Sequence, residues 1–187
     1  GLWENFRHVS VGVSIDGVEK VNDYIRYPSK WENIEKNIKK ISTYKDEISM
    51  DLQIQSTFQM MNVLDWGNLL EWTYNLGDLG FWRLPFSNWV SYPQHYDAKL
   101  LPKDLKVEAL EKINKFLDSK KDIVWDIGEQ QWLGILESNL KTFEKSFDDD
   151  EQERYYKTIK KHTKLLDLNR GQHIKDYIPE LEKFIYE

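Results

Sequence analysis

Hydrophobic and polar residues alternate close to the start of the chain. Residues 8–15 carry valine or isoleucine at every second position, with histidine, serine or glycine between them. This period of two is typical of a β-strand, whose side chains point alternately to opposite faces of the sheet. Asp16 and Gly17 follow as a turn signal, and a short helical stretch leads to Pro28. The pattern therefore predicts a strand that ends near Ile15.

The next segments repeat this strand and helix order. Apolar residues at helical spacing predict an amphipathic helix over residues 29–42, and Ser29 with Glu32 fits a capping box at its start. Residues 48–55 then alternate as residues 8–15 do, and an apolar cluster around residues 69–72 indicates a helix after them. The first 75 residues are thus expected to form two strand–helix units.

A third strand is expected between Phe81 and Tyr92, where Pro85 and Pro93 limit its length because proline cannot donate to a sheet ladder. Beyond this point the spacing of apolar residues is helical. Helices are expected around residues 105–117, 132–143, 156–166 and 178–185, with Pro102, the acidic run 148–151 and Gly171 as boundary signals.

Strands separated by helices predict an α/β fold with a parallel sheet, whose crossover connections are right-handed. Helices normally cover both faces of such a sheet, so its strands are usually apolar on both sides. Here one face of each of the first two strands is aliphatic, whereas the other carries mainly serine, glycine, glutamine and threonine. We therefore expect the sheet to curve around a polar lumen.

The composition narrows the possible functions. The 187 residues have a net charge of −6, which argues against a non-specific nucleic-acid binder because such a protein needs a basic face. No apolar run reaches the roughly 20 residues that span a bilayer, and no signal peptide is evident, so we expect a cytoplasmic protein without membrane contact. The chain has no cysteine, which excludes disulfides, a thiol nucleophile and a thiolate-held cluster on this chain.

Ser14-Ile15-Asp16-Gly17 lies at the carboxyl end of the first predicted strand. Ligands bind at this end of the strands in α/β barrels and open α/β sheets. Gly17 allows a sharp turn of the backbone, and Ser14 would direct its hydroxyl into the lumen. An ordinary strand-to-helix turn is the alternative interpretation of this tetrapeptide.

The segment 6–37 contains Val-Ser-Ile-Asp-Gly-Val at 13–18, Asn-Asp-Tyr-Ile-Arg-Tyr-Pro-Ser at 22–29, and then Trp31. Shorter motifs follow: Thr57 with Asn62, Leu-Pro-Lys-Asp-Leu-Lys at 101–106, Leu166-Asp167 with Arg170-Gly171-Gln172, and Pro179-Glu180-Leu181. In this order they resemble the later part of radical S-adenosylmethionine (radical SAM) proteins that carry a twitch domain. The first segment is fairly specific, and the others are short.

This resemblance implies a partial (β/α)₆ barrel that binds S-adenosylmethionine (SAM) and a [4Fe–4S] iron–sulfur cluster. Residues 1–125 would form the C-terminal half of that barrel, and residues 126–187 a helical C-terminal extension packed on it. In the family's chemistry, the cluster cleaves SAM reductively and the resulting 5′-deoxyadenosyl radical abstracts hydrogen from a substrate. The substrate, whether a peptide, a protein or a small molecule, is left open.

The resemblance also implies roles for single residues. Ser14 would hydrogen-bond the ribose or methionyl part of SAM, and Arg26 would pair with its carboxylate, since guanidinium binds carboxylates through two parallel hydrogen bonds. The other residues expected to face the lumen or its rim are Gln53, Gln55, Thr57 and Asn62. Under the alternative interpretation, Arg26 pairs with an acid such as Asp23 and the glutamines hydrogen-bond one another.

The family's three-cysteine loop and Gly-Gly-Glu strand belong to its N-terminal half and do not occur in this sequence. We therefore expect a fragment, inactive by itself, whose partner is the missing N-terminal half of the barrel and whose first strand has an open edge. The rival hypothesis is a non-catalytic binding or scaffold module derived from such a barrel. His95 and Asp97 form a His-x-Asp pair, which we interpret as structural because one such pair in a loop is weak evidence for a metal site.

Overall fold

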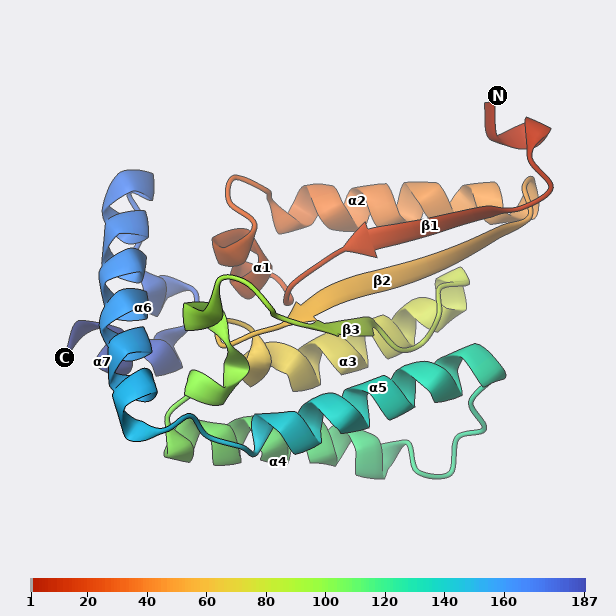
Figure 1. Cartoon of the computed structure of the whole chain (residues 1–187). Helices are drawn as coiled ribbons and strands as arrows, with labels where there is room; N and C mark the ends of the chain where they lie inside the picture. The colour runs from red at the N-terminus through yellow and green to blue at the C-terminus, as the bar shows by residue number, and fades with distance from the viewer. Residues whose placement is uncertain (1) are drawn as a thin grey trace.

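A three-stranded, all-parallel open sheet is the centre of the computed structural model, which describes residues 2–187 (Figure 1). The strands are β1 (Val9–Ser14), β2 (Met50–Phe58) and β3 (Phe86–Trp89), in the spatial order β1-β2-β3. Each predicted strand is present, and the parallel α/β arrangement is confirmed. Among the described residues, β1 and β3 each have one neighbouring strand, so both are edge strands.

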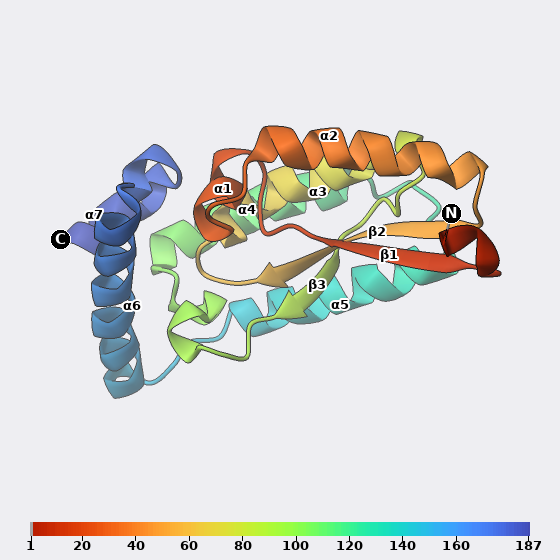
Figure 2. The ribbon, with the colours of Figure 1, turned by 90° about the horizontal axis from the view of Figure 1, so that it is seen from above.

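Helices cover one face of this sheet. The α-helices of residues 2–187 are α1 (Lys20–Ile25), α2 (Trp31–Ser42), α3 (Trp66–Asn75), α4 (Lys103–Ser119), α5 (Ile127–Phe143), α6 (Asp149–Arg170) and α7 (Glu182–Tyr186). Figure 2 shows α2 and α3 on the same side of the strands, with α4 packed against α3 and α5 against β3. Within this part of the chain, no helix combines the length and the apolar composition needed to cross a bilayer.

The two C-terminal helices lie at the carboxyl end of the strands. In both ribbon views α6 crosses this end of the sheet, and α7 packs against α6. The side chain of Asp148 accepts a hydrogen bond from the backbone N–H of Glu151 at 2.9 Å, and α6 ends at Gly171, whose φ is 61°. Both boundary signals of this helix are therefore confirmed.

The predicted capping box of α2 is wrong. Lys30 precedes the helix and makes no side-chain cap. Ser29 remains in the turn after Pro28, where its backbone N–H donates to the carbonyl oxygen of Arg26 at 2.8 Å, so it is one position too early to cap α2. A capping box occurs instead at α5.

The core lies between the covered face of the sheet and the helices. Phe58 of β2 is fully buried there, and its ring centroid lies 4.7 Å from that of Trp66, 5.5 Å from that of Trp89 and 5.7 Å from that of Phe143. These four rings join β2, α3, β3 and α5. The aromatic residues are thus core residues at this position, and they hold the sheet against its helices.

Candidate functional site

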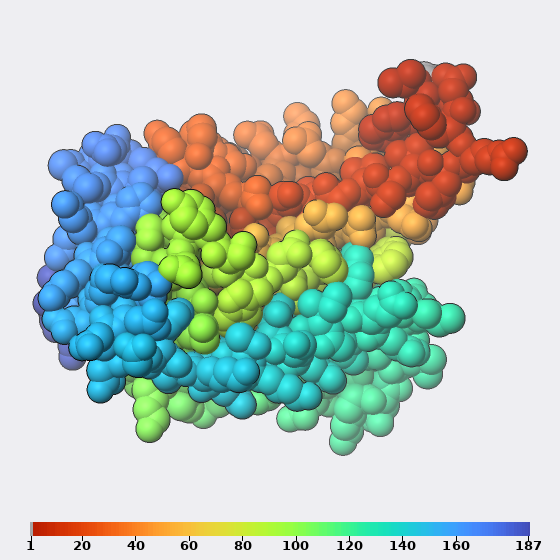
Figure 3. Space-filling view, viewed as in Figure 1, coloured from red at the N-terminus to blue at the C-terminus, as the bar shows by residue number. Residues whose placement is uncertain are grey.

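The opposite face of the sheet is polar along β1 and β2 and is not covered by a helix there, whereas Phe86 of β3 packs against Trp132 of α5. Ser14 of β1 is the register partner of Gln55 of β2, and Thr57 is the partner of Asn88 of β3, so these side chains share one face. The face is turned toward the viewer in Figure 3, where β1, β2 and β3 are at the surface between α2 and α5. Ser14 is exposed, whereas Gln55 and Thr57 are half-buried.

The glutamines of β2 pack on β1 instead of bonding each other. The side-chain amide of Gln53 donates to the hydroxyl of Ser10 at 3.3 Å, which is a weak hydrogen bond. The amide of Gln55 lies over Gly12, where an added Cβ would be 2.6 Å from Nε2 of Gln55. The structure therefore places Ser14, Gln53 and Gln55 on one face, as predicted, and gives the glutamines partners on β1.

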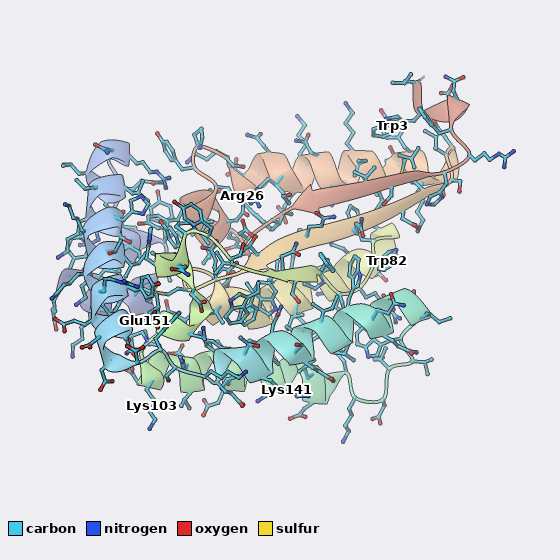
Figure 4. All side chains as sticks on the ribbon, viewed as in Figure 1. Trp3, Arg26, Trp82, Lys103, Lys141 and Glu151 are labelled. Carbon is cyan, nitrogen blue, oxygen red and sulfur yellow. The ribbon has the colours of Figure 1, made fainter. Side chains whose placement is uncertain are left out.

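Arg26 pairs with an acid, as the alternative interpretation expects, but the acid is Asp16 and not Asp23. Nη2 of Arg26 lies 2.7 Å from Oδ2 of Asp16, and Figure 4 shows Arg26 near the carboxyl end of β1. The reason is geometric, because α1 lies at the carboxyl end of β1 and brings Arg26 to Asp16, the second residue after the strand. Nε of Arg26 is buried without a hydrogen-bond partner.

Asp16 is the centre of the polar contacts at the strand ends. Its side chain is buried, with the residue only 5% exposed, and Oδ1 accepts the backbone N–H of Thr57 at 2.8 Å. The side-chain oxygen of Asn22 accepts the backbone N–H of Asp16 at 3.0 Å. Asp16 therefore joins the end of β1 to the end of β2 and to α1. The sequence indicated this role only through the position of Asp16, which directly follows the predicted strand.

The turn after Asp16 is joined to the next loop by a second acid. Gly17 has a φ of 145°, and the following N–H, that of Val18, donates to Oδ2 of Asp65 at 2.7 Å. Asn68 also donates to the other oxygen of Asp65, at 2.8 Å. Burial raises the pKa of Asp65 to about 6, because desolvation outweighs these hydrogen bonds.

Asn62 supports the loop after β2. The sequence predicts this residue at the rim of the lumen, whereas the structure buries it to 1% exposure. Its amide donates to the carbonyl oxygen of Thr57 at 2.7 Å, and its oxygen accepts the N–H of Gln59 at 3.0 Å. The buried backbone of this loop needs hydrogen-bond partners, and Asn62 supplies them. The side-chain N–H₂ and C=O groups of Asn62 are therefore both engaged within the chain.

A small cavity of about 220 Å³ lies beyond the strand ends. Its walls come from α1, the loop after β2, the 3₁₀ turn Gln94–Tyr96 and α6, and include Tyr24, Met61, Tyr96 and Arg170. Nη1 of Arg170 donates to the backbone oxygen of Tyr24 at 2.9 Å. The sequence did not indicate this cavity, because its residues lie in separate segments of the chain.

Asp167 holds the C-terminal helices in place. Its buried carboxylate accepts hydrogen bonds from the hydroxyls of Tyr24 and Tyr186, each at 2.8 Å, and from the backbone N–H of Ile174 at 2.9 Å. Burial and the bond to Asp167 raise the pKa of the Tyr24 hydroxyl well above its ordinary range. Asp167 and Arg170, from the short C-terminal motif, thus connect α6 to α1.

The residues of this chain do not fit an iron–sulfur cluster. The sequence has no cysteine, and residues 2–187 contain no group of three His, Cys, Asp or Glu side chains that could hold a metal ion. No protein-family model, curated protein or solved structure matches the chain. A parallel α/β sheet is shared by proteins of many functions, so the fold alone does not assign one.

Proposed function

We propose that this chain forms the C-terminal part of a radical SAM-type barrel, and that the polar face of its sheet lines the lumen for SAM and substrate. The supporting observation is the uncovered face itself. Parallel strands are normally covered on both faces, yet Ser10, Gly12 and Ser14 of β1 are exposed on this one. The resemblance of residues 6–37 to radical SAM proteins accounts for such a face as the wall of a lumen.

The open edge of β1 supports the same proposal. Within the described part of the chain, β1 is paired with β2 only, so its outer backbone N–H and C=O groups have no strand partner. Edges of this kind accept additional strands. In the proposed barrel, an N-terminal half pairs with this edge and carries the cysteines that the present chain lacks.

Ser14 is the residue best placed to contact SAM. Its exposed hydroxyl lies at the carboxyl end of β1, and Gln55 is beside it on β2. Arg26 would act indirectly, because its ion pair holds Asp16 at the end of the same strand. When bound, SAM and its cluster supply the 5′-deoxyadenosyl radical, and the residues of this chain position the cofactor and exclude water.

A non-catalytic binding module is the second candidate. The observation that favours it is that the polar groups at the strand ends already have partners within the chain, since Arg26 pairs with Asp16 and Asn62 bonds the backbone. In such a module these residues are structural, and the open edge of β1 binds a partner protein by strand addition.

The test uses the protein made from the full reading frame that encodes this chain, reconstituted with iron and sulfide without oxygen. The enzyme proposal expects 5′-deoxyadenosine from SAM under reducing conditions. Ser14→Ala should weaken SAM binding about tenfold. This corresponds to the loss of one hydrogen bond that contributes about 1.4 kcal/mol to the binding free energy. Ser10→Ala is the matched control, because this serine lies on the same face of the same strand but away from its carboxyl end.

Each outcome separates the two candidates. Cleavage of SAM that depends on Ser14 and not on Ser10 supports the enzyme proposal and the position of the cofactor. Equal effects of the two substitutions contradict the assigned role of Ser14. A folded protein that takes up no cluster and cleaves no SAM contradicts the enzyme proposal and leaves the binding module.

A further inference from the structure

Two histidines from distant parts of the chain lie side by side, one on α6 and one on a turn that packs against this helix. His95 belongs to the 3₁₀ turn η5 (Gln94–Tyr96), and His162 belongs to α6. Nε2 of His95 is 3.4 Å from Nδ1 of His162, and the hydroxyl of Tyr96 is 3.1 Å from the same Nδ1. The histidines line an open pocket of about 450 Å³. Asp97 is not part of this group, since it caps the next turn and accepts from Trp89.

The spacing of these nitrogens is that of two ligands on one tetrahedral metal ion. Zinc–nitrogen distances of about 2.0–2.1 Å at a tetrahedral angle place the nitrogens about 3.4 Å and the ring centroids about 5.2 Å apart. The two rings have these spacings, 3.4 Å between the nitrogens and 5.2 Å between the centroids. A linear N–H···N hydrogen bond of the same length would separate the centroids by roughly 5.7 Å. The separations of the nitrogens and of the ring centroids thus match those of two ligands on one ion.

We propose that His95 and His162 bind a divalent transition-metal ion such as Zn²⁺. The hydroxyl of Tyr96 is a third, weaker ligand, and the fourth position is open to the pocket. Imidazole ligands suit zinc, copper and nickel, whereas calcium and magnesium require several oxygen ligands. Lys157 and Lys161 line the same pocket and oppose a further positive charge, which favours metals with a high intrinsic affinity for imidazole.

The two histidines are held in place by contacts outside the pair. The hydroxyl of Tyr155 donates to the side-chain oxygen of Gln94 at 2.5 Å, and this bond holds η5 against α6. Tyr155 lies two turns before His162 on the same face of the helix, and Gln94 directly precedes His95. The metal would therefore bind a site that is largely formed and would cross-link two segments of the chain.

The experiment titrates Zn²⁺ into the chain without a histidine tag and follows binding by calorimetry. Co²⁺ is the spectroscopic probe, because tetrahedral coordination produces strong visible absorption. We expect one site per chain, with affinity at least about tenfold weaker in His95→Ala and in His162→Ala. His173→Ala is the matched control, since His173 stacks on Tyr186 away from this pocket, and its affinity should be unchanged.

Zinc should also raise the melting temperature of the wild-type chain but not that of the double variant His95→Ala/His162→Ala. Circular dichroism shows whether each variant is folded. If an alanine variant is not folded, His162→Gln is used in its place. Zinc binding that is unchanged in the folded double variant overturns the proposal. Absence of Zn²⁺ and Co²⁺ binding to the wild-type chain overturns it as well.

Discussion

The ion pair between Asp16 and Arg26 is expected to be a main source of stability at the carboxyl end of the sheet. Asp16 is 5% exposed and lies 2.7 Å from the guanidinium, whereas the side chain of Arg26 is 35% exposed. Arg26→Ala would leave a buried carboxylate without a counter-ion. Removing one partner of a fully buried pair costs about 3–5 kcal/mol, and solvent near Arg26 reduces this, so we expect a loss of about 2–3 kcal/mol.

A double-mutant cycle isolates the pair itself. Asp16→Asn removes the charge but keeps an oxygen that can accept the N–H of Thr57. Arg26→Ala should therefore cost less in that background, with a coupling energy of about 1–2 kcal/mol. The matched control is the pair of Glu153 and Lys157, whose charged atoms are 2.6 Å apart but whose side chains are 67% and 75% exposed. Its coupling energy should stay below about 0.5 kcal/mol.

The assay is equilibrium urea unfolding followed by tryptophan fluorescence, with unchanged m-values as the condition for comparing free energies. A coupling energy for Asp16 and Arg26 no larger than that of the exposed pair would refute the reasoning. If Arg26 acts on SAM alone, Arg26→Ala leaves the free energy of unfolding unchanged and weakens only cofactor binding. The cycle thus distinguishes the structural role of this arginine from the cofactor contact implied by the family resemblance.

Two further predictions concern buried acids and their partners. Tyr186→Phe removes one of the hydroxyls that donate to Asp167 and should cost about 1 kcal/mol in urea unfolding at pH 7. Burial and this hydrogen bond raise the pKa of Tyr186 to about 12. The stabilisation of the fold by the protonated hydroxyl is therefore complete below pH 10 and is lost as the pH rises toward 12. Because burial raises the pKa of Asp65 to about 6, the charged acid opposes folding progressively as the pH rises from about 4 through 6. Between pH 4 and pH 8 the free energy of unfolding of Asp65→Asn should therefore rise by about 2 kcal/mol relative to that of the wild type. Urea unfolding across this pH range measures the difference.

Exposed residues of the same types are the controls for these two substitutions. Tyr92 is 86% exposed, and Tyr92→Phe should change the free energy of unfolding by less than about 0.5 kcal/mol. An effect of Tyr186→Phe no larger than this would argue against its bond to Asp167. Asp122→Asn removes an exposed acid, and a pH dependence equal to that of Asp65→Asn would show that burial of Asp65 is not the cause.

The sequence by itself determined the elements and the two-sided character of the sheet. Alternation over residues 8–15 and 48–55 predicted β1 and β2 and separated their apolar and polar faces. Asp148 and Gly171 marked both ends of α6. These properties depend on the residue period and on end caps, which involve neighbours a few positions apart and therefore follow from local sequence. Ser29 failed as a cap because the turn after Pro28 shifted the helix start.

Only the tertiary structure decided which polar groups are partners. Arg26 pairs with Asp16 instead of the nearer Asp23, because α1 lies at the carboxyl end of β1. Asp167 binds the hydroxyl of Tyr24 across 143 positions of the chain. The contact between the segments of residues 95 and 162 likewise depends on where α6 packs. Such pairs are selected by the burial of whole elements against one another, and the hydrophobic energy that drives this packing is not directional, so no local pattern in the sequence specifies them.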